Sequence, residues 1–213
     1  MIKEISQEII DNQFDYIIDC VVDYFGEEYS KEIKDRADNV KIMLIREKGS
    51  FKTSEGEVYV GDEPVCIKDE DGANVIIPLS LMGDSRGNVA FVHVLLHALG
   101  EECFIKGGKD AFNEVIVDYM ADDICKMLKE EKLNITMSNK PIYESNSFYS
   151  NMFEEIEDFY NENVDNIIAA RMGRKVEFDD IDEIDDYIDS AQQVVDKAFF
   201  EEVSKEDFKI KKR

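Results

Sequence analysis

The sequence predicts an α+β fold, in which a small, mostly antiparallel sheet packs on a buried helix and a helical C-terminal half follows. Two observations support this. Several long stretches repeat apolar residues at intervals of three and four, which is the period of an amphipathic helix, whereas residues 40–80 hold short alternating runs separated by turns. The chain of 213 residues is long enough to bury a core of its own. We expect an α+β part over residues 1–130 and a helical part over 131–213.

The first predicted element is a helix over residues 2–25. Its isoleucines, valines and phenylalanines recur at helical spacing, and Gly26 supplies a stop. A shorter helix is expected over residues 29–38. Residues 40–46 then place Val40, Ile42 and Leu44 at every second position, which is typical of a strand with one buried face.

Three further β-prone runs follow, at residues 58–60, 65–67 and 75–79. Turn-prone pairs such as Asp71-Gly72 separate them. We therefore expect one sheet of three or four strands, mostly antiparallel, in this part of the chain.

The rest of the chain is predicted to be helical. Residues 89–99 are apolar on nearly all sides apart from two histidines, which indicates a buried helix that ends at Gly100. Amphipathic helices are expected over residues 109–130, 147–171 and 179–201, with a polar linker between the first two.

The charge of the chain excludes two classes of partner. It holds 49 acidic and 25 basic residues, for a net charge of −24. Such a chain repels the phosphates of nucleic acids and the surfaces of anionic membranes, so we expect neither as a partner. The acidity serves either solubility through self-repulsion or the attraction of a basic partner.

The four cysteines show no CxxC spacing and have apolar neighbours, so we expect them to be small core residues. No run approaches the roughly 18 apolar residues of a membrane span. Glu4 and Glu8 interrupt the segment where a signal peptide needs an unbroken apolar stretch. We therefore expect a cytoplasmic protein with reduced thiols.

The only two histidines of the chain, His93 and His97, are four residues apart. Four residues make about one helical turn, so both imidazoles project from one face of the helix. That geometry suits two nitrogen ligands of one metal ion. The alternative is a pair of unrelated core histidines, each of which would need a hydrogen-bond partner to offset its burial.

The next helix offers a third ligand. Glu114 lies in a mostly apolar segment, where a lone carboxylate is costly unless it is paired or bound to a metal. Asp118 lies one turn later on the same face. It is therefore placed to accept a hydrogen bond from the second ring nitrogen of one histidine.

The segments FVHVLLHAL and FNEVIVDYMA resemble the gluzincin branch of zinc metallopeptidases, which has HExxH on one helix and a glutamate ligand on a following helix. The resemblance implies zinc as cofactor, with His93, His97 and Glu114 as its ligands and Asp118 as the acid that supports a ligand histidine. It also implies a sheet with an edge strand that aligns a peptide substrate. The likeness covers about residues 75–125.

Val94 departs from the family pattern, because HExxH has a glutamate at this position. In the family, that glutamate takes a proton from the zinc-bound water and passes it to the leaving amine. Positioned acid–base catalysis contributes about 10²–10⁴-fold to rate. We therefore expect a pseudopeptidase that binds zinc and acts by holding a peptide or protein.

Two alternatives stay open. One is an active metal-dependent hydrolase whose general base has moved to Glu101 or Glu102. The other is an interaction protein whose site holds no metal. The family also uses a side chain to stabilise the oxyanion, and here the sequence favours none of the available residues over the others: Tyr143, Tyr149, Tyr160 and Arg171.

Overall fold

The computed structural model describes residues 7–45, 49–52, 57–61, 64–69, 72–78, 87–101, 110–129 and 150–178. By its internal contacts the chain divides into two compact units. The first unit is Met1–Glu101 with Val117–Ser145, and the second is Glu102–Ile116 with Asn146–Arg213. The predicted boundary between residues 130 and 131 lies outside the described residues and stays a prediction.

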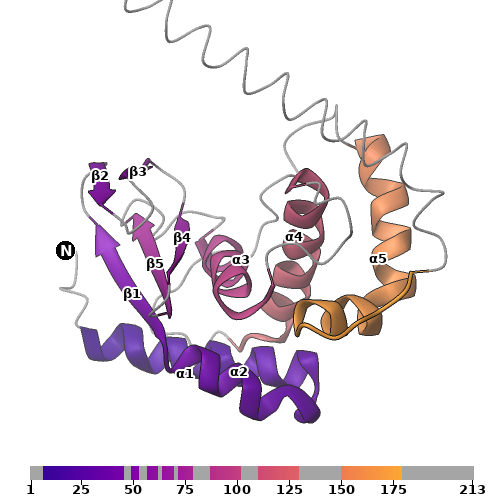
Figure 1. Cartoon of the computed structure of the whole chain (residues 1–213), viewed down its shortest axis with the longest axis horizontal. Coiled ribbons are helices and arrows are strands. Elements are labelled where there is room, and N and C mark those ends of the chain that lie inside the picture. The colour runs from indigo at the N-terminus through magenta and orange to yellow at the C-terminus, as the bar shows by residue number, and fades with distance from the viewer. Residues whose placement is uncertain are drawn as a thin grey trace, which may run out of the picture. The chain divides into compact units, whose positions relative to one another are not determined.

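The first unit begins with two helices, α1 (Gln7–Phe25) and α2 (Ser30–Ala37), joined by the 3-10 turn η1 (Glu27–Tyr29). The two helices pack against each other (Figure 1). The predicted stop at Gly26 is confirmed, because this residue adopts a φ of 104°, which L side chains rarely allow.

The described strands form two separate sheets. In the first, the order is β1 (Val40–Ile45), β5 (Gly72–Pro78) and β4 (Val65–Asp69), and in the second β2 (Gly49–Lys52) pairs with β3 (Glu57–Val60). The pairings of β4 with β5 and of β2 with β3 are antiparallel, whereas β1 runs parallel to β5.

The α+β class is confirmed, but the sheet differs from the prediction in two respects. The prediction of one mostly antiparallel sheet is wrong, because the larger sheet is mixed and a two-stranded sheet stands apart from it. Strand β2 is also absent from the prediction. Its sequence, GSFK, shows no alternation of apolar and polar residues. This segment is extended because it forms hydrogen bonds with β3, which local sequence does not reveal.

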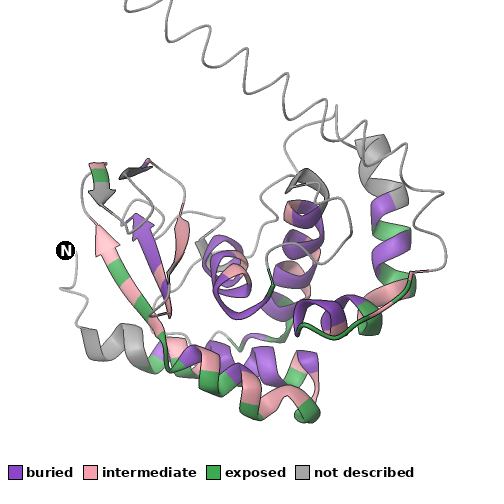
Figure 2. Ribbon diagram, viewed as in Figure 1, coloured by how far each residue is buried: buried purple, intermediate pink, exposed green. Residues whose placement is uncertain are grey.

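Strand β5 is central in its sheet and is more buried than its two neighbours, β1 and β4 (Figure 2). Val75 and Ile76 have no exposed surface. Helix α3 (Gly87–Leu99) packs on β4 and β5 and also contacts α2. The sheet and α2 therefore place α3, the helix of the two histidines, in the core of the first unit.

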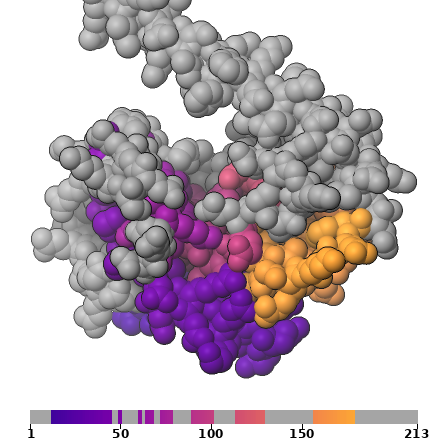
Figure 3. Space-filling view, in the orientation of Figure 1, coloured from indigo at the N-terminus to yellow at the C-terminus, as the bar shows by residue number. Residues whose placement is uncertain are grey.

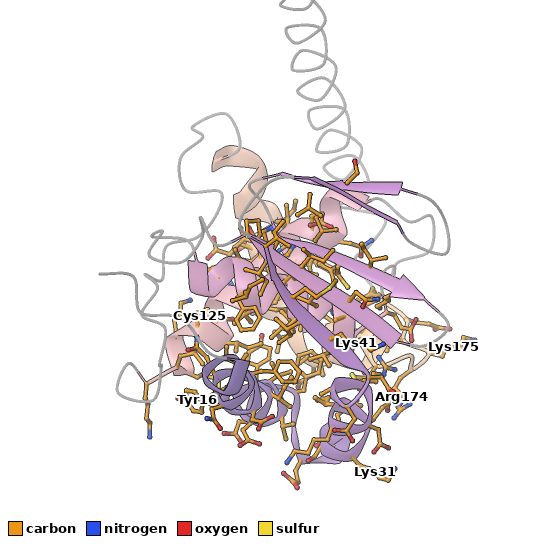
Figure 4. The ribbon with its side chains drawn as sticks, turned by 90° about the vertical axis from the view of Figure 1, so that its left-hand side faces the viewer. Tyr16, Lys31, Lys41, Cys125, Arg174 and Lys175 are labelled. Carbon is orange, nitrogen blue, oxygen red and sulfur yellow. The ribbon has the colours of Figure 1, made fainter. Side chains whose placement is uncertain are left out.

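Helix α4 (Asp110–Met127) runs through the point where the two units divide, between Ile116 and Val117. Its second half belongs to the first unit. There the backbone N–H of Lys129, just after the helix, donates a 2.8 Å hydrogen bond to the hydroxyl of Tyr16 on α1. Tyr16 is labelled in Figure 4.

No disulfide joins the described cysteines. Cys20 and Cys125 are buried as predicted, whereas Cys66, at the edge strand β4, is only partly buried. Burial raises the pKa of the Cys125 thiol to about 12, with contributions from the nearby Asp122 carboxylate and from Cys20. A thiol with so high a pKa is neither a nucleophile nor a ready metal ligand near neutral pH.

The second unit contains α5 (Ser150–Arg171), which confirms the helix predicted over residues 147–171. Gly173 ends it with a φ of 73°, and the N–H of Arg174 donates back to the carbonyl of Ala169. The helix predicted over residues 179–201 lies outside the described residues. None of the described helices combines the length and the apolar character that crossing a membrane requires.

Candidate metal centre

Helix α3 exposes only its two histidines over most of its length. From Val89 to Gly100 every residue is buried except His93 and His97, which are partly exposed. The spacing of one turn places both rings on one side of the helix, with their centroids 4.8 Å apart. An otherwise apolar helix thus presents two imidazoles together at an accessible position.

The facing nitrogens of these rings are close together. The Nε2 atoms of His93 and His97 are 3.0 Å apart. Two ring nitrogens at this distance either share one proton or turn their lone pairs to a common ion. In a tetrahedral zinc site with bonds of about 2.0–2.1 Å, two ligand nitrogens lie about 3.4 Å apart. The observed spacing is therefore near that of two ligands of one ion.

Asp118 of α4 holds the other side of the His93 ring. The Nδ1–H of His93 donates to Oδ1 of Asp118 over 2.7 Å, and the two side chains are only 13% and 9% exposed. This contact favours the neutral tautomer with the proton on Nδ1, so Nε2 carries the lone pair that a metal ligand needs. The predicted contact between Asp118 and one histidine is present, and His93 is the partner.

Glu114 completes the group. It lies one turn before Asp118 on α4, so both carboxylates project from the same side of that helix. One ligand atom from each of His93, His97 and Glu114 lies within 4.8 Å of the others. Because α4 is one continuous helix, the contact of Asp118 with His93 also sets where Glu114 stands. The structure thus brings the three predicted ligands together.

The donor set fits a divalent transition ion. Two imidazole nitrogens and one carboxylate are the protein ligands of many catalytic zinc sites, which keep a fourth position open. Calcium and magnesium prefer oxygen ligands, so they suit this set poorly. The residues can therefore hold a divalent transition-metal ion such as zinc. The donor set does not distinguish zinc from other ions of this kind.

No protein-family model, curated protein or solved structure matches the chain. The metal-site assignment therefore rests on the donor chemistry and the distances in the structure. The resemblance to gluzincins stays a prediction.

Val94 stands where the gluzincin pattern would have a glutamate, and its side chain is apolar and buried. Val94 is 3% exposed and has no group that accepts a proton. Glu101, the described alternative base, is exposed, and its Oε1 lies 3.6 Å from the Arg36 guanidinium. Its carboxylate therefore faces a cation on α2. The other proposed base, Glu102, lies outside the described residues.

Two of the four residues considered for stabilising an oxyanion are described in the structure. Tyr160 and Arg171 belong to the second unit and are buried there, with 2% and 0% of their surfaces exposed. Tyr143 and Tyr149 lie outside the described residues.

Sequence reasoning misses two basic residues at the end of α3. Arg36 of α2 and Lys68 of β4 both donate hydrogen bonds to backbone carbonyls there. Each residue lies far from α3 in the chain and carries no local motif, so only the tertiary structure shows their shared target.

Proposed function

We propose that this protein is a zinc-binding pseudopeptidase of gluzincin type, which keeps the metal ligands, lacks the general base and acts by binding a peptide or protein. The observation that supports the proposal most is the pair of contacts on His93. Its Nδ1–H donates to Asp118 over 2.7 Å, and its Nε2 lies 3.0 Å from Nε2 of His97. With Glu114 beside them, these contacts present the donors as a metal site would.

The absence of a base at Val94 favours binding over turnover. When bound, a zinc ion supplies Lewis acidity that can polarise a carbonyl. Hydrolysis also needs a group that removes a proton from the attacking water, and its loss typically lowers the rate by about 10²–10⁴-fold. Asp118 already accepts a hydrogen bond from His93, and Glu101 faces Arg36, so neither side chain is placed to replace that group.

Strand β4 is the proposed binding edge for an extended peptide. Among the described strands β4 pairs with β5 alone, and it packs on α3, the helix of the histidines. A peptide can add to such an edge through backbone hydrogen bonds. The net charge of −24 favours a basic peptide through electrostatic attraction.

The experiment that tests this function compares metal content with peptidase activity. Protein purified without chelator is analysed for zinc by mass spectrometry and incubated with a mixed peptide library. We expect one zinc per chain and no cleavage. Cleavage that a chelator abolishes would instead favour the active hydrolase with a relocated base. A chain that takes up no zinc, even with excess zinc present, would favour the interaction protein without a metal.

The Val94→Glu and Val94→Gln variants sharpen this test. Both introduce a side chain of similar size, but only glutamate accepts a proton. With one zinc still bound to each variant, we expect chelator-sensitive cleavage from the glutamate variant alone. If both variants retain zinc and neither cleaves peptides, the site lacks further groups that a peptidase needs besides the base.

A further inference from the structure

Two basic side chains from different elements hold the C-terminal end of α3. Nη1 of Arg36, on α2, donates to the carbonyl of Leu99 over 2.6 Å. Nζ of Lys68, on β4, donates to the carbonyl of Gly100 over 2.5 Å. Both hydrogen bonds are partly buried, and all four residues belong to the first unit. The end of the helix is therefore tied to a second helix and to the sheet.

The Arg36 side chain is itself held in place. Its Nη2 lies 2.7 Å from Oε1 of Glu32, one turn earlier on α2, and 3.6 Å from Oε1 of Glu101. The side chains of Arg36 and Glu32 are 27% and 31% exposed, so this ion pair is partly withdrawn from solvent. A planar guanidinium fixed in this way loses little further freedom when it also binds a carbonyl.

The same helix offers a contrasting pair. Lys31 and Asp35 form an ion pair within α2, and their side chains are 89% and 61% exposed. Lys31 is labelled in Figure 4, and the atoms of the α1–α2 segment, indigo to purple, lie at the surface in Figure 3. Such an exposed pair contributes little to stability. It therefore serves as a matched control for Arg36.

The end of α3 needs such partners for a physical reason. The last carbonyls of a helix have no partners within the helix and concentrate partial negative charge, which basic side chains stabilise. His97 belongs to this last turn, and Leu99 follows it by two residues. Fraying of the turn would therefore move one of the two imidazoles. Metal sites tolerate errors of only about 0.2 Å in ligand distance.

We infer that Arg36 and Lys68 are positioning residues of the metal centre, because they fix the last turn of α3 and so keep His97 beside His93 and Glu114. This inference rests on the proposed metal site. A positioning role differs from a purely structural role in its effect on the metal Kd. A variant that destabilises the metal-free and metal-bound proteins equally leaves the metal Kd unchanged, whereas loss of positioning raises it.

The test uses cobalt(II) alone as the probe, because its visible absorption reports both binding and ligand geometry. Cobalt is titrated into the metal-free full-length chain and into the Arg36→Met, Lys68→Met and Lys31→Met variants. The unfolding of each metal-free variant is measured in urea. Arg36→Lys, which keeps the charge and loses the planar fork, provides a milder change that preserves the fold.

We expect the Arg36→Met and Lys68→Met variants to raise the cobalt Kd about tenfold and to shift the visible absorption bands, a size typical of groups that orient metal ligands. Arg36→Lys should fall between them and the wild type, and Lys31→Met should match the wild type within about twofold. Unchanged Kd values alongside lowered stability would overturn the inference and leave a structural role. A wild-type chain that binds no cobalt would overturn the proposed function itself.

Discussion

The His93 ring is held between two partners, with Nδ1 2.7 Å from Oδ1 of Asp118 and Nε2 3.0 Å from Nε2 of His97. Nδ1 thus donates a hydrogen bond to a carboxylate, and Nε2 faces the corresponding nitrogen of His97. A neutral imidazole has one N–H donor and one acceptor nitrogen, so a buried ring needs a partner at each nitrogen. Together with Glu114, the two rings form a group that could hold one metal ion.

Replacing Asp118 tests the role of that hydrogen bond. Asp118→Asn removes the negative charge that stabilises the Nδ1–H of His93, so we expect zinc affinity to fall about 10–100-fold. Asp123→Asn is the control, because Asp123 lies on the same helix and bonds Lys126 instead. The affinities are measured by competition with a chromophoric chelator. Equal zinc affinity in the two variants would show that Asp118 does not support metal binding.

Gly72 is predicted to be indispensable to the main sheet. Its φ is 136°, and a Cβ added there would meet the carbonyl oxygen of Asn39 at 2.2 Å. We expect Gly72→Ala to lower the free energy of unfolding by about 2–4 kcal/mol, since the strain and the clash add. Gly49→Ala is the control, because no atom lies within 4 Å of its added Cβ. Urea unfolding of both variants checks this, and equal stabilities would refute the close approach.

The buried thiol of Cys125 predicts a loss of stability in alkali. Its pKa rises from 9.0 to about 12 on folding. The neutral thiol is thus favoured in the folded state. This stability is fully present below pH 9 and is lost as the pH rises toward 12, because the unfolded chain releases its proton first.

Between pH 9 and 10 this thiol should lower the free energy of unfolding by about 1 kcal/mol. Other groups also titrate in this range, so the Cys125→Ala variant supplies the baseline. Urea unfolding at both pH values should show a steeper decline for the wild type than for the variant. Parallel declines would mean that the thiol is accessible to water in the folded protein.

Local patterns in the sequence predict the helices and the histidine pair well. The apolar period of α1 and the continuous apolar run of α3 need no tertiary information, because a helix places side chains by sequence spacing alone. The same rule places His93 with His97 and Glu114 with Asp118. These pairs are the parts of the site that a sequence can show.

Features that depend on distant residues are less predictable. The parallel pairing of β1 with β5 joins strands that are separated by β2, β3 and β4, and alternation within a strand gives no information on the direction of its neighbour. The contacts of Arg36 and Lys68 with the end of α3 are similarly non-local. Nothing near either residue in the sequence points to a backbone carbonyl elsewhere.

The central claim is that His93 and His97 bind one metal ion. The most direct measurement is the zinc content and thermal stability of the wild type and of the His93→Ala and His97→Ala variants, purified side by side without chelator. We predict one zinc per chain in the wild type and loss of both the zinc and the stability it adds in each variant. Unchanged metal content and thermal stability in His93→Ala would contradict the account.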